Sequence, residues 1–203
     1  METVPTALTL SGVALSRGGQ PLVAGLSLRV ESGEVLWVTG PNGTGKTTLL
    51  LACAKLLAVE EGTIAWEGHS ARSAVAYAAH TGPERDGLTL GEELAFWQRL
   101  SGDSLPLEAR LASVGLAGRE ATPVSGLSAG QRRRLSLARL LGSGKPAWLM
   151  DEPLAGLDTD GQALVSRCLV DHVARGGLAL VASHQPVAIP GLQARKLVLE
   201  TPS

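Results

Sequence analysis

The sequence predicts an α/β fold, with a parallel-sheet core, N-terminal antiparallel β-strands and a short helical insert. Nearly continuous apolar runs at 34–39, 146–151 and 178–183 are typical of strands that are buried on both faces. Helices with capping residues lie between these runs, and strands that alternate with helices form parallel sheets. Two partly alternating stretches near the start of the chain indicate an antiparallel pair.

The first part of the chain contains mostly strands. Strand patterns occur at 7–14, 22–30, 34–39, 62–68 and 75–79. A helix is expected over 45–57. Thr89 and Glu92 then form a capping box for a helix through about Leu100, and Pro106 fits the first turn of a second helix. These two helices make up the expected insert.

The strand pattern returns after the insert. Ser128 and Gln131 form a second capping box, for a helix that Gly142 stops. Asp158 can cap a further helix, and a last, outer strand is expected at 196–200. We expect a single domain over 1–203, with its core over 1–84 and 126–203 and the insert over 85–125.

Composition excludes several classes of protein. The 203 residues include 18 Lys and Arg against 19 Asp and Glu, so the net charge of −1 provides no chain-wide basic footprint for nucleic acid. Cys53 and Cys168 form no CxxC pair, which argues against a disulfide framework. The mean hydropathy is +0.16, yet no apolar run approaches the roughly 18 residues of a membrane span. We expect a cytosolic chain whose apolar excess lies in a sheet core, on a partner surface, or both.

The segment after the third strand is rich in glycine and contains the pattern G-x-x-x-x-G-K-[ST]. Its residues are Gly40, Pro41, Asn42, Gly43, Thr44, Gly45, Lys46, Thr47 and Thr48. Glycines permit a tight loop whose backbone N–H groups face phosphate oxygens, and the following helix adds its positive dipole end. Lys46 can reach the β- and γ-phosphates, and the Thr47 hydroxyl can bind Mg²⁺. A plain strand–turn–helix connection is the alternative.

Two carboxylates end the apolar run at 146–151. A carboxylate at the carboxyl end of a parallel strand lies where α/β sheets bind ligands. Asp151 can therefore hold Mg²⁺, directly or through water. Glu152 points elsewhere and is placed to activate a water that attacks the γ-phosphate. A strand that simply ends in solvated acids is the alternative.

A third segment, LSAGQ at 127–131, precedes a helix whose N-terminus favours an anion. The order of phosphate loop, LSAGQ, carboxylate strand and His184 resembles the nucleotide-binding subunits of ABC transporters, over essentially the whole chain. In this resemblance, the signature segment comprises Ser128, Ala129, Gly130 and Gln131. Ala155, Gly156, Leu157 and Asp158 are similar to the D-loop, and His184 lies in the position of the switch histidine. A capped surface helix and a core histidine are the alternatives.

The resemblance implies a P-loop NTPase core of the RecA-like type and an Mg²⁺-dependent ATPase that uses ATP. It implies catalytic roles for Lys46, Glu152 and His184. It also implies a head-to-tail homodimer that forms when ATP binds, in which the phosphate loop of one subunit meets the signature segment of the other.

Two positions depart from the family pattern. An aromatic residue that stacks on adenine is expected where the sequence has Arg17, whose guanidinium can stack instead. A solvated loop arginine is the alternative. His80 stands where a glutamine that reaches Mg²⁺ is expected, so it is a candidate metal ligand or only shapes the loop.

The small size, the short insert and these departures narrow the resemblance to the ATPase subunits of bacterial haem exporters in cytochrome c maturation. That implies integral membrane partners that handle haem, a peripheral position on the cytoplasmic face of the membrane, and no direct haem binding. Another small ABC transporter and a soluble ABC-type ATPase outside transport are the alternatives. Sustained heptads, which a soluble repair ATPase would carry, do not occur. A phosphotransferase would not need LSAGQ, and the intact Lys46, Asp151, Glu152 and His184 argue against a non-catalytic subunit.

Three further groups of side chains receive structural interpretations. The basic residues of the helix after LSAGQ are interpreted as a solvated face or, alternatively, as groups that orient charge near the partner's nucleotide, and they are Arg132, Arg133, Arg134 and Arg139. Apolar residues of the insert helix are interpreted as core or, alternatively, as a docking surface for a membrane subunit, and they are Leu94, Phe96, Trp97 and Leu100. His69 and His172 are expected on the surface.

Overall fold

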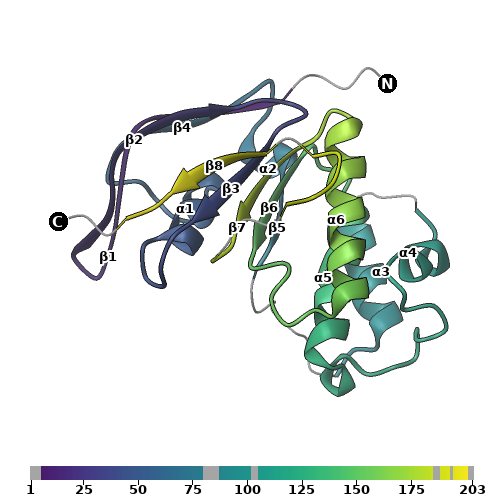
Figure 1. Cartoon of the computed structure of the whole chain (residues 1–203). Coiled ribbons are helices and arrows are strands. Elements are labelled where there is room, and N and C mark those ends of the chain that lie inside the picture. The colour runs from purple at the N-terminus through teal and green to yellow at the C-terminus, as the bar shows by residue number, and fades with distance from the viewer. Residues whose placement is uncertain (1–5, 80–86, 102–104, 185–187, 193, 201–203) are drawn as a thin grey trace. The chain divides into compact units, whose positions relative to one another are not determined.

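The computed structural model describes residues 6–79, 87–101, 105–184, 188–192 and 194–200. Contacts within the chain divide it into two compact units (Figure 1). The first unit comprises Met1–Tyr77, Lys145–Pro153 and Leu169–Ser203, and the second comprises Ala78–Gly144 and Leu154–Cys168.

The first unit holds two sheets. An antiparallel sheet has the order β2-β1-β4, with β1 at Ala7–Arg17, β2 at Gln20–Val30 and β4 at Glu61–Glu67. A second sheet has the order β5-β6-β7-β3-β8, from strands at Val75–Ala78, Ala147–Asp151, Leu178–Ala182, Val35–Thr39 and Ala194–Val198. Its β3–β7, β6–β7 and β3–β8 pairs are parallel. The predicted α/β class is confirmed, and β8 is an edge strand as expected, although it begins before 196.

Strands β3, β6 and β7 are buried along their whole length. Their apolar side chains join residues of β1 and of the helix α1 in one core cluster, represented by Leu36, Leu149, Leu180, Leu10 and Leu49. Burial of each such side chain stabilises the fold by about 1.5–3 kcal/mol. This cluster explains why the three runs lack the alternation that marks a strand with one wet face.

Helix α1 spans Lys46–Cys53, so it is shorter than the predicted 45–57. Lys55 has a left-handed backbone with φ of 58°. Its N–H donates to Ala52 O, and the N–H of Leu56 donates to Leu51 O. These two bonds form a Schellman motif, which ends the helix with lysine at the position that glycine usually occupies. No glycine marked this end in the sequence, which is why the prediction was too long.

The second unit is mostly helical. It contains α3 at Leu90–Ser101, α4 at Leu107–Ser113, a 3-10 turn at Val124–Gly126, α5 at Ala129–Leu141 and the first part of α6 at Thr159–Ala174. Another short helix, α2 at Ala71–Ala74, belongs to the first unit. Both predicted capping boxes are confirmed by reciprocal bonds between Thr89 and Glu92 and between Ser128 and Gln131. Each box satisfies two backbone donors and so starts a helix where the sequence predicts it.

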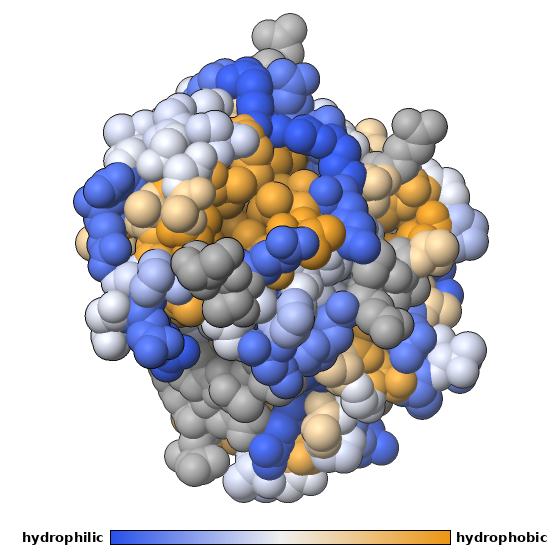
Figure 2. Space-filling view, turned by 60° about the vertical axis from the view of Figure 1, so that its left-hand side comes forward, coloured by the Kyte–Doolittle hydropathy of each residue, from blue (hydrophilic) through white to orange (hydrophobic). Residues whose placement is uncertain are grey.

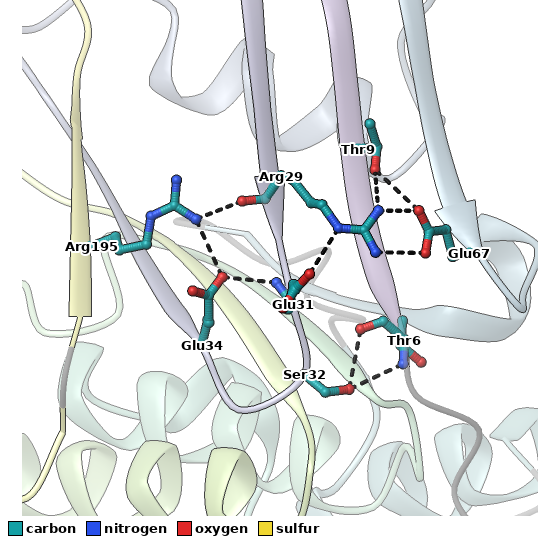
Figure 3. Close-up of polar contacts among 8 residues, drawn as sticks. All are labelled: Thr6, Thr9, Arg29, Glu31, Ser32, Glu34, Glu67 and Arg195. Atoms are coloured by element: carbon teal, nitrogen blue, oxygen red, sulfur yellow. Dashed lines mark hydrogen bonds and ion pairs between the residues drawn. The ribbon is translucent and has the colours of Figure 1, made fainter.

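A polar network joins the antiparallel sheet, the β2–β3 turn and β8 (Figure 3). Arg29 on β2 bonds Glu31 and also reaches across β1 to Glu67 on β4. These hydrogen bonds hold the pKa of Glu67 below its ordinary value. Arg195 on β8 donates to Arg29 O at 2.6 Å and to Glu34 Oε2 at 3.3 Å. Exposed ion pairs contribute little stability individually, so the network mainly registers these segments against one another.

Some apolar surface remains outside the core. The exposed large apolar residues of the described part of the chain are Leu56, Leu57, Leu100, Leu105 and Val198. Figure 2 shows one broad apolar area bordered by hydrophilic residues, together with smaller apolar areas elsewhere on the same face. The apolar excess of the composition is therefore divided between the sheet core and the surface. No helix of the described residues is long and apolar enough to cross a membrane.

His172 on α6 lies in the core, so its predicted surface position is wrong. Its ring stacks on that of Trp148, with the ring centroids 3.9 Å apart and an angle of 10° between the ring planes. The Nε2 atom of His172 lies 3.1 Å from Leu178 O. A Cβ at Gly177 would lie 2.4 Å from the ring, so only glycine leaves room there. Burial lowers the pKa of His172 from 6.5 to about 4.

This buried ring predicts a pH dependence of stability. Because the pKa of His172 is depressed from 6.5 to about 4 on folding, the unfolded chain takes up the proton first as the pH falls. The free energy of unfolding that this ring contributes is complete above pH 6.5 and is lost between pH 6.5 and 4. By pH 5 the loss should be about 2 kcal/mol.

Urea unfolding of the parent and of His172→Phe at about pH 7.5 and pH 5 measures this loss. Phenylalanine keeps a ring on Trp148 but cannot titrate. Between the two pH values, the free energy of unfolding of the parent should therefore fall by about 2 kcal/mol more than that of the variant. Equal pH slopes for the two proteins would show that His172 does not control this transition.

Candidate functional site

The glycine-rich loop connects β3 to α1 in the first unit. Gly40 has φ of 144°, and a Cβ there would lie 2.3 Å from Leu199 O. Gly45 has φ of 97° at the N-terminus of α1, where a Cβ would lie 3.0 Å from Leu22 Cβ. Both positions therefore need glycine for backbone conformation and for space. The loop leads directly to the N-terminus of α1, where the helix dipole favours an anion.

Lys46 folds back over this loop. Its Nζ donates to Gly40 O at 2.8 Å and to Pro41 O at 2.9 Å, and the residue is only 7% exposed. Thr44 Oγ1 also donates to Pro41 O, at 3.0 Å. The loop thus encloses a positive charge that two backbone carbonyls hold in place, which suits the binding of an anion.

Thr47 and Asp151 come together although 104 positions separate them. Thr47 Oγ1 donates to Asp151 Oδ2 at 2.8 Å, and Asp151 is 4% exposed at the end of β6. Hydroxyl and carboxylate oxygens are ligands that Mg²⁺ accepts, so this pair fits the ion. The described residues contain no group of three or more His, Cys, Asp or Glu that would hold a metal alone. A site of this kind draws its other ligands from nucleotide phosphates and water.

Glu152 follows Asp151 with a strained backbone. Its φ of 49° is left-handed, and its N–H donates to Ala182 O at 2.9 Å. The side chain is 14% exposed, and Oε1 is buried without a hydrogen bond to any described residue. His184 Nε2 lies 3.5 Å from that oxygen. A buried carboxylate oxygen with its acceptor capacity unused is suited to take a proton from water.

His184 follows the end of β7. The N–H of Ser183 donates to Val38 O at 3.0 Å, which fixes this end of β7 beside β3. The His184 side chain remains 53% exposed, so the alternative of a core histidine is wrong. The strand order therefore places Glu152 and His184 side by side at the carboxyl ends of neighbouring strands.

Tyr77 on β5 is a neighbour of the carboxylate that the sequence analysis missed. Burial and then the negative charge of Asp151 raise the pKa of the Tyr77 phenol to about 12. The strand at 75–79 was predicted, but only the order β5-β6 shows that this aromatic lies beside the carboxylate.

Arg17 ends β1 at the tip of the β1–β2 hairpin, where it pairs with Gln20 and is exposed. In the same hairpin, Leu22 and Val23 lie against Gly45 of the phosphate loop. The hairpin thus reaches the loop, and stacking of Arg17 on adenine stays a prediction. His80 lies outside the described residues.

The remaining predicted site residues lie in the second unit. Ser128 caps α5, with its Oγ accepting from the N–H of Gln131 at 3.3 Å, and Ala129 and Gly130 begin the helix. Asp158 is exposed, and its Oδ1 accepts from the N–H of Gly161 at 2.8 Å at the start of α6. The structure therefore brings Lys46, Thr47, Asp151, Glu152 and His184 together in the first unit, and gathers the signature and D-loop residues in the second.

The basic residues of α5 do not form a solvated face, so that interpretation is wrong. All four arginines are half-buried. Arg132 donates to Ser125 O at 3.1 Å and Arg134 to Val114 O at 3.2 Å. Arg139 pairs with the fully buried Glu93. The guanidinium groups of Arg132, Arg134 and Arg139 thus donate to backbone and carboxylate acceptors within the second unit.

The apolar residues of the insert helix divide between the two interpretations. Leu94 is core, and Trp97 is half-buried with its Nε1 donating to Glu93 Oε1 at 2.8 Å. Phe96 packs edge-on against Trp97, while Leu100 is 63% exposed. Exposed Leu100 leaves room for a docking surface at the end of α3.

Comparison with known proteins supports the resemblance to ABC transporter subunits. The family described as ABC transporter matches residues 23–155. The cytochrome c biogenesis ATP-binding export protein CcmA of Nitrobacter winogradskyi is 43% identical, over 94% of this chain and 96% of that protein. The protein of the same name from Xanthomonas axonopodis pv. citri is 44% identical, over 98% of this chain and 97% of that protein.

A solved structure of an ABC transporter ATP-binding protein from Pyrococcus furiosus shares the fold, with a TM-score of 0.82 over 95% of this chain and 97% of that chain, at 21% identity. The matching fold, the extent of the sequence matches and the loop and strand motifs show that this chain belongs to the ABC transporter family of ATP-binding proteins, in the branch of the CcmA proteins.

Proposed function

We propose that this chain is the Mg²⁺-dependent ATPase subunit of a membrane transporter that serves haem export in cytochrome c biogenesis. The observation that carries the ATPase assignment is the position of Glu152 Oε1, which is buried, has no hydrogen bond to a described residue and lies 3.5 Å from His184 Nε2. The near full-length identity to proteins named for cytochrome c biogenesis supports the cargo. A nucleotide-binding core over 1–84 and 126–203, with an insert over 85–125, is part of this proposal.

The loop at 40–48 binds the phosphates of the nucleotide. The Lys46 ammonium, now on two loop carbonyls, neutralises the β- and γ-phosphates when they enter. The N-terminus of α1 adds N–H donors that have no partner within the helix. Arg17 is the proposed contact for adenine.

Residues at the carboxyl ends of β6 and β7 carry out hydrolysis. Thr47 and Asp151 would hold Mg²⁺, with His80 as a further candidate ligand, and the bound ion would stabilise negative charge on the phosphates. Glu152 Oε1 accepts a proton as water attacks the γ-phosphorus, and the bond from that phosphorus to ADP breaks. His184 donates a hydrogen bond to the γ-phosphate. The products are ADP and inorganic phosphate.

A second copy of the chain completes each site on ATP binding. The signature residues Ser128–Gln131 are placed at the N-terminus of α5, which favours the phosphates of the partner's nucleotide. Asp158 at the N-terminus of α6 belongs to the same contact. We expect a homodimer with two nucleotides between its subunits.

The partners in this proposal are integral membrane subunits that handle haem. The chain works at the cytoplasmic face of the membrane and binds neither nucleic acid nor haem itself. The exposed Leu100 in α3 and the exposed Leu105, which precedes α4, are candidate contacts for such a subunit.

The cargo is tested in a strain that lacks this chain. Such a strain should lose covalent haem from its c-type cytochromes, as haem staining of membranes measures. The parent chain should restore them, and so should the control Lys196→Ala on the exposed edge strand β8. Lys46→Ala should not, because loss of the phosphate-binding charge should lower ATP turnover at least about 100-fold.

Two outcomes separate the parts of the proposal. Normal c-type cytochromes in the deletion strain would refute the haem cargo and leave the ATPase standing. Full ATP turnover by purified Lys46→Ala would refute the phosphate site.

A further inference from the structure

The guanidinium of Arg134 is held by the end of α4. Its Nη1 donates to Val114 O at 3.2 Å, and the side chain is 22% exposed. Gly115 has φ of 69°, and a Cβ there would lie 2.7 Å from Arg134 Nη1. The positive φ favours glycine at this position, and a side chain there would have to displace the guanidinium from Val114 O.

The other edge of the same guanidinium faces the D-loop. Arg134 Nη2 lies 3.6 Å from Asp158 Oδ1. That oxygen also accepts from the N–H of Gly161, so Asp158 is held both by Arg134 and by the first turn of α6. One edge of the planar guanidinium thus donates a hydrogen bond to Val114 O, and the other edge lies within ion-pair distance of Asp158 Oδ1.

A second contact joins the same two segments. A Cβ at Gly130 would lie 3.9 Å from Leu157 Cδ2, so the D-loop leucine covers the signature glycine. Gly130 and Arg134 are four positions apart and therefore share one face of α5. Leu157 and Asp158 thus lie along this face at two successive turns.

The ion pair itself adds little to stability. Asp158 is 74% exposed, and exposed pairs are screened by water. Its value is geometric, because it connects two segments that both face the nucleotide of a partner subunit in the proposed dimer.

We propose that Arg134 is a positioning residue that fixes Asp158 and the D-loop against the signature helix, so that both segments approach the partner's nucleotide as one body. This inference rests on the proposed ATPase function. Arg134 acts through Asp158 and does not itself bind phosphate.

A double-mutant cycle on the full chain tests this role. Arg134→Ala and Asp158→Asn should each lower kcat about tenfold with little change in KM for ATP, because nucleotide binding to the first unit is intact. The double variant should be no slower than either single variant. Arg134→Lys, which keeps the charge but not the fork, should recover about threefold. The control Arg99→Ala, on the exposed side of α3, should hydrolyse ATP as the parent does.

A structural role alone would move different quantities. Multiplicative losses in the double variant, of about 100-fold, would overturn the coupling of Arg134 to Asp158. Urea unfolding measures the fraction of each variant that is folded. A loss of kcat no larger than the loss of folded protein would also overturn the coupling. ATP turnover in the parent together with either result would leave the proposed function intact. A parent without ATP turnover would refute the proposed function, and with it this role of Arg134.

Discussion

Glu152→Gln should lower ATP turnover by a factor of about 10²–10⁴ while ATP binding persists. Glutamine has the same size and can keep the left-handed turn after β6, but its amide cannot take a proton from water. The carboxylate oxygen that would do so is buried, 3.5 Å from His184 Nε2, and accepts no hydrogen bond from the part of the chain that the structure describes. Chemistry therefore stops after the nucleotide is bound, and the ATP-bound dimer should accumulate.

Phosphate release and light scattering measure the two halves of this result. With Mg²⁺ and ATP, the variant should elute at twice the mass of the chain and should retain ATP rather than ADP. Glu200→Gln, at an exposed position after β8, is the matched control and should turn over ATP like the parent. A Glu152→Gln protein that hydrolyses ATP at the parent's rate would assign the general base to another group.

Arg139→Met should destabilise the fold by about 3–5 kcal/mol. Glu93 is fully buried, and its Oε1 accepts from both Trp97 Nε1 and Arg139 Nη2. Its Oε2 has no hydrogen bond to any described residue. Removal of Arg139 leaves this carboxylate without its cationic partner in the core between α3 and α5. The cost comes from a charge that has lost both its partner and its water.

Urea unfolding at neutral pH measures the loss, with Arg99→Met on α3 as the control that removes an exposed arginine. Arg139→Met combined with Glu93→Leu should recover most of the stability, because apolar replacement of a buried pair is often close to neutral. A double variant as unstable as the single one would show that packing of the Arg139 guanidinium, whose Cζ lies 5.5 Å from the centroid of the Trp97 ring, matters more than the charge pair.

Local features of the fold were predictable because their partners are close in the sequence. The capping boxes at Thr89 and Ser128 depend on residues three positions away, and both form as expected. The phosphate loop depends on glycines at Gly40 and Gly45, where the backbone is left-handed or closely packed. The end of α1 escaped prediction because Lys55 takes the role of a C-terminal glycine, and nothing in its residue type indicates this.

Side chains with distant partners were harder to assign. The sequence places His172 on the surface because its stacking partner Trp148 belongs to β6, and only folding brings the two together. It places Arg139 on a solvated face because the partner Glu93 is 46 positions away. In both cases the residue type favours exposure, and burial is stabilised by one specific neighbour that the local pattern does not contain.

The composition and local patterns of this chain established the α/β class, the helix starts and the chemical types of the site residues, since these depend on periodicity and on contacts within one turn. The order β5-β6-β7-β3-β8 settled which of those residues meet. It brings the Thr47 hydroxyl within hydrogen-bond distance of Asp151 and His184 next to Glu152. These residues come from segments that lie far apart in the chain. Strand order follows from burial of whole strand faces, which is a property of the packed core and of no single segment.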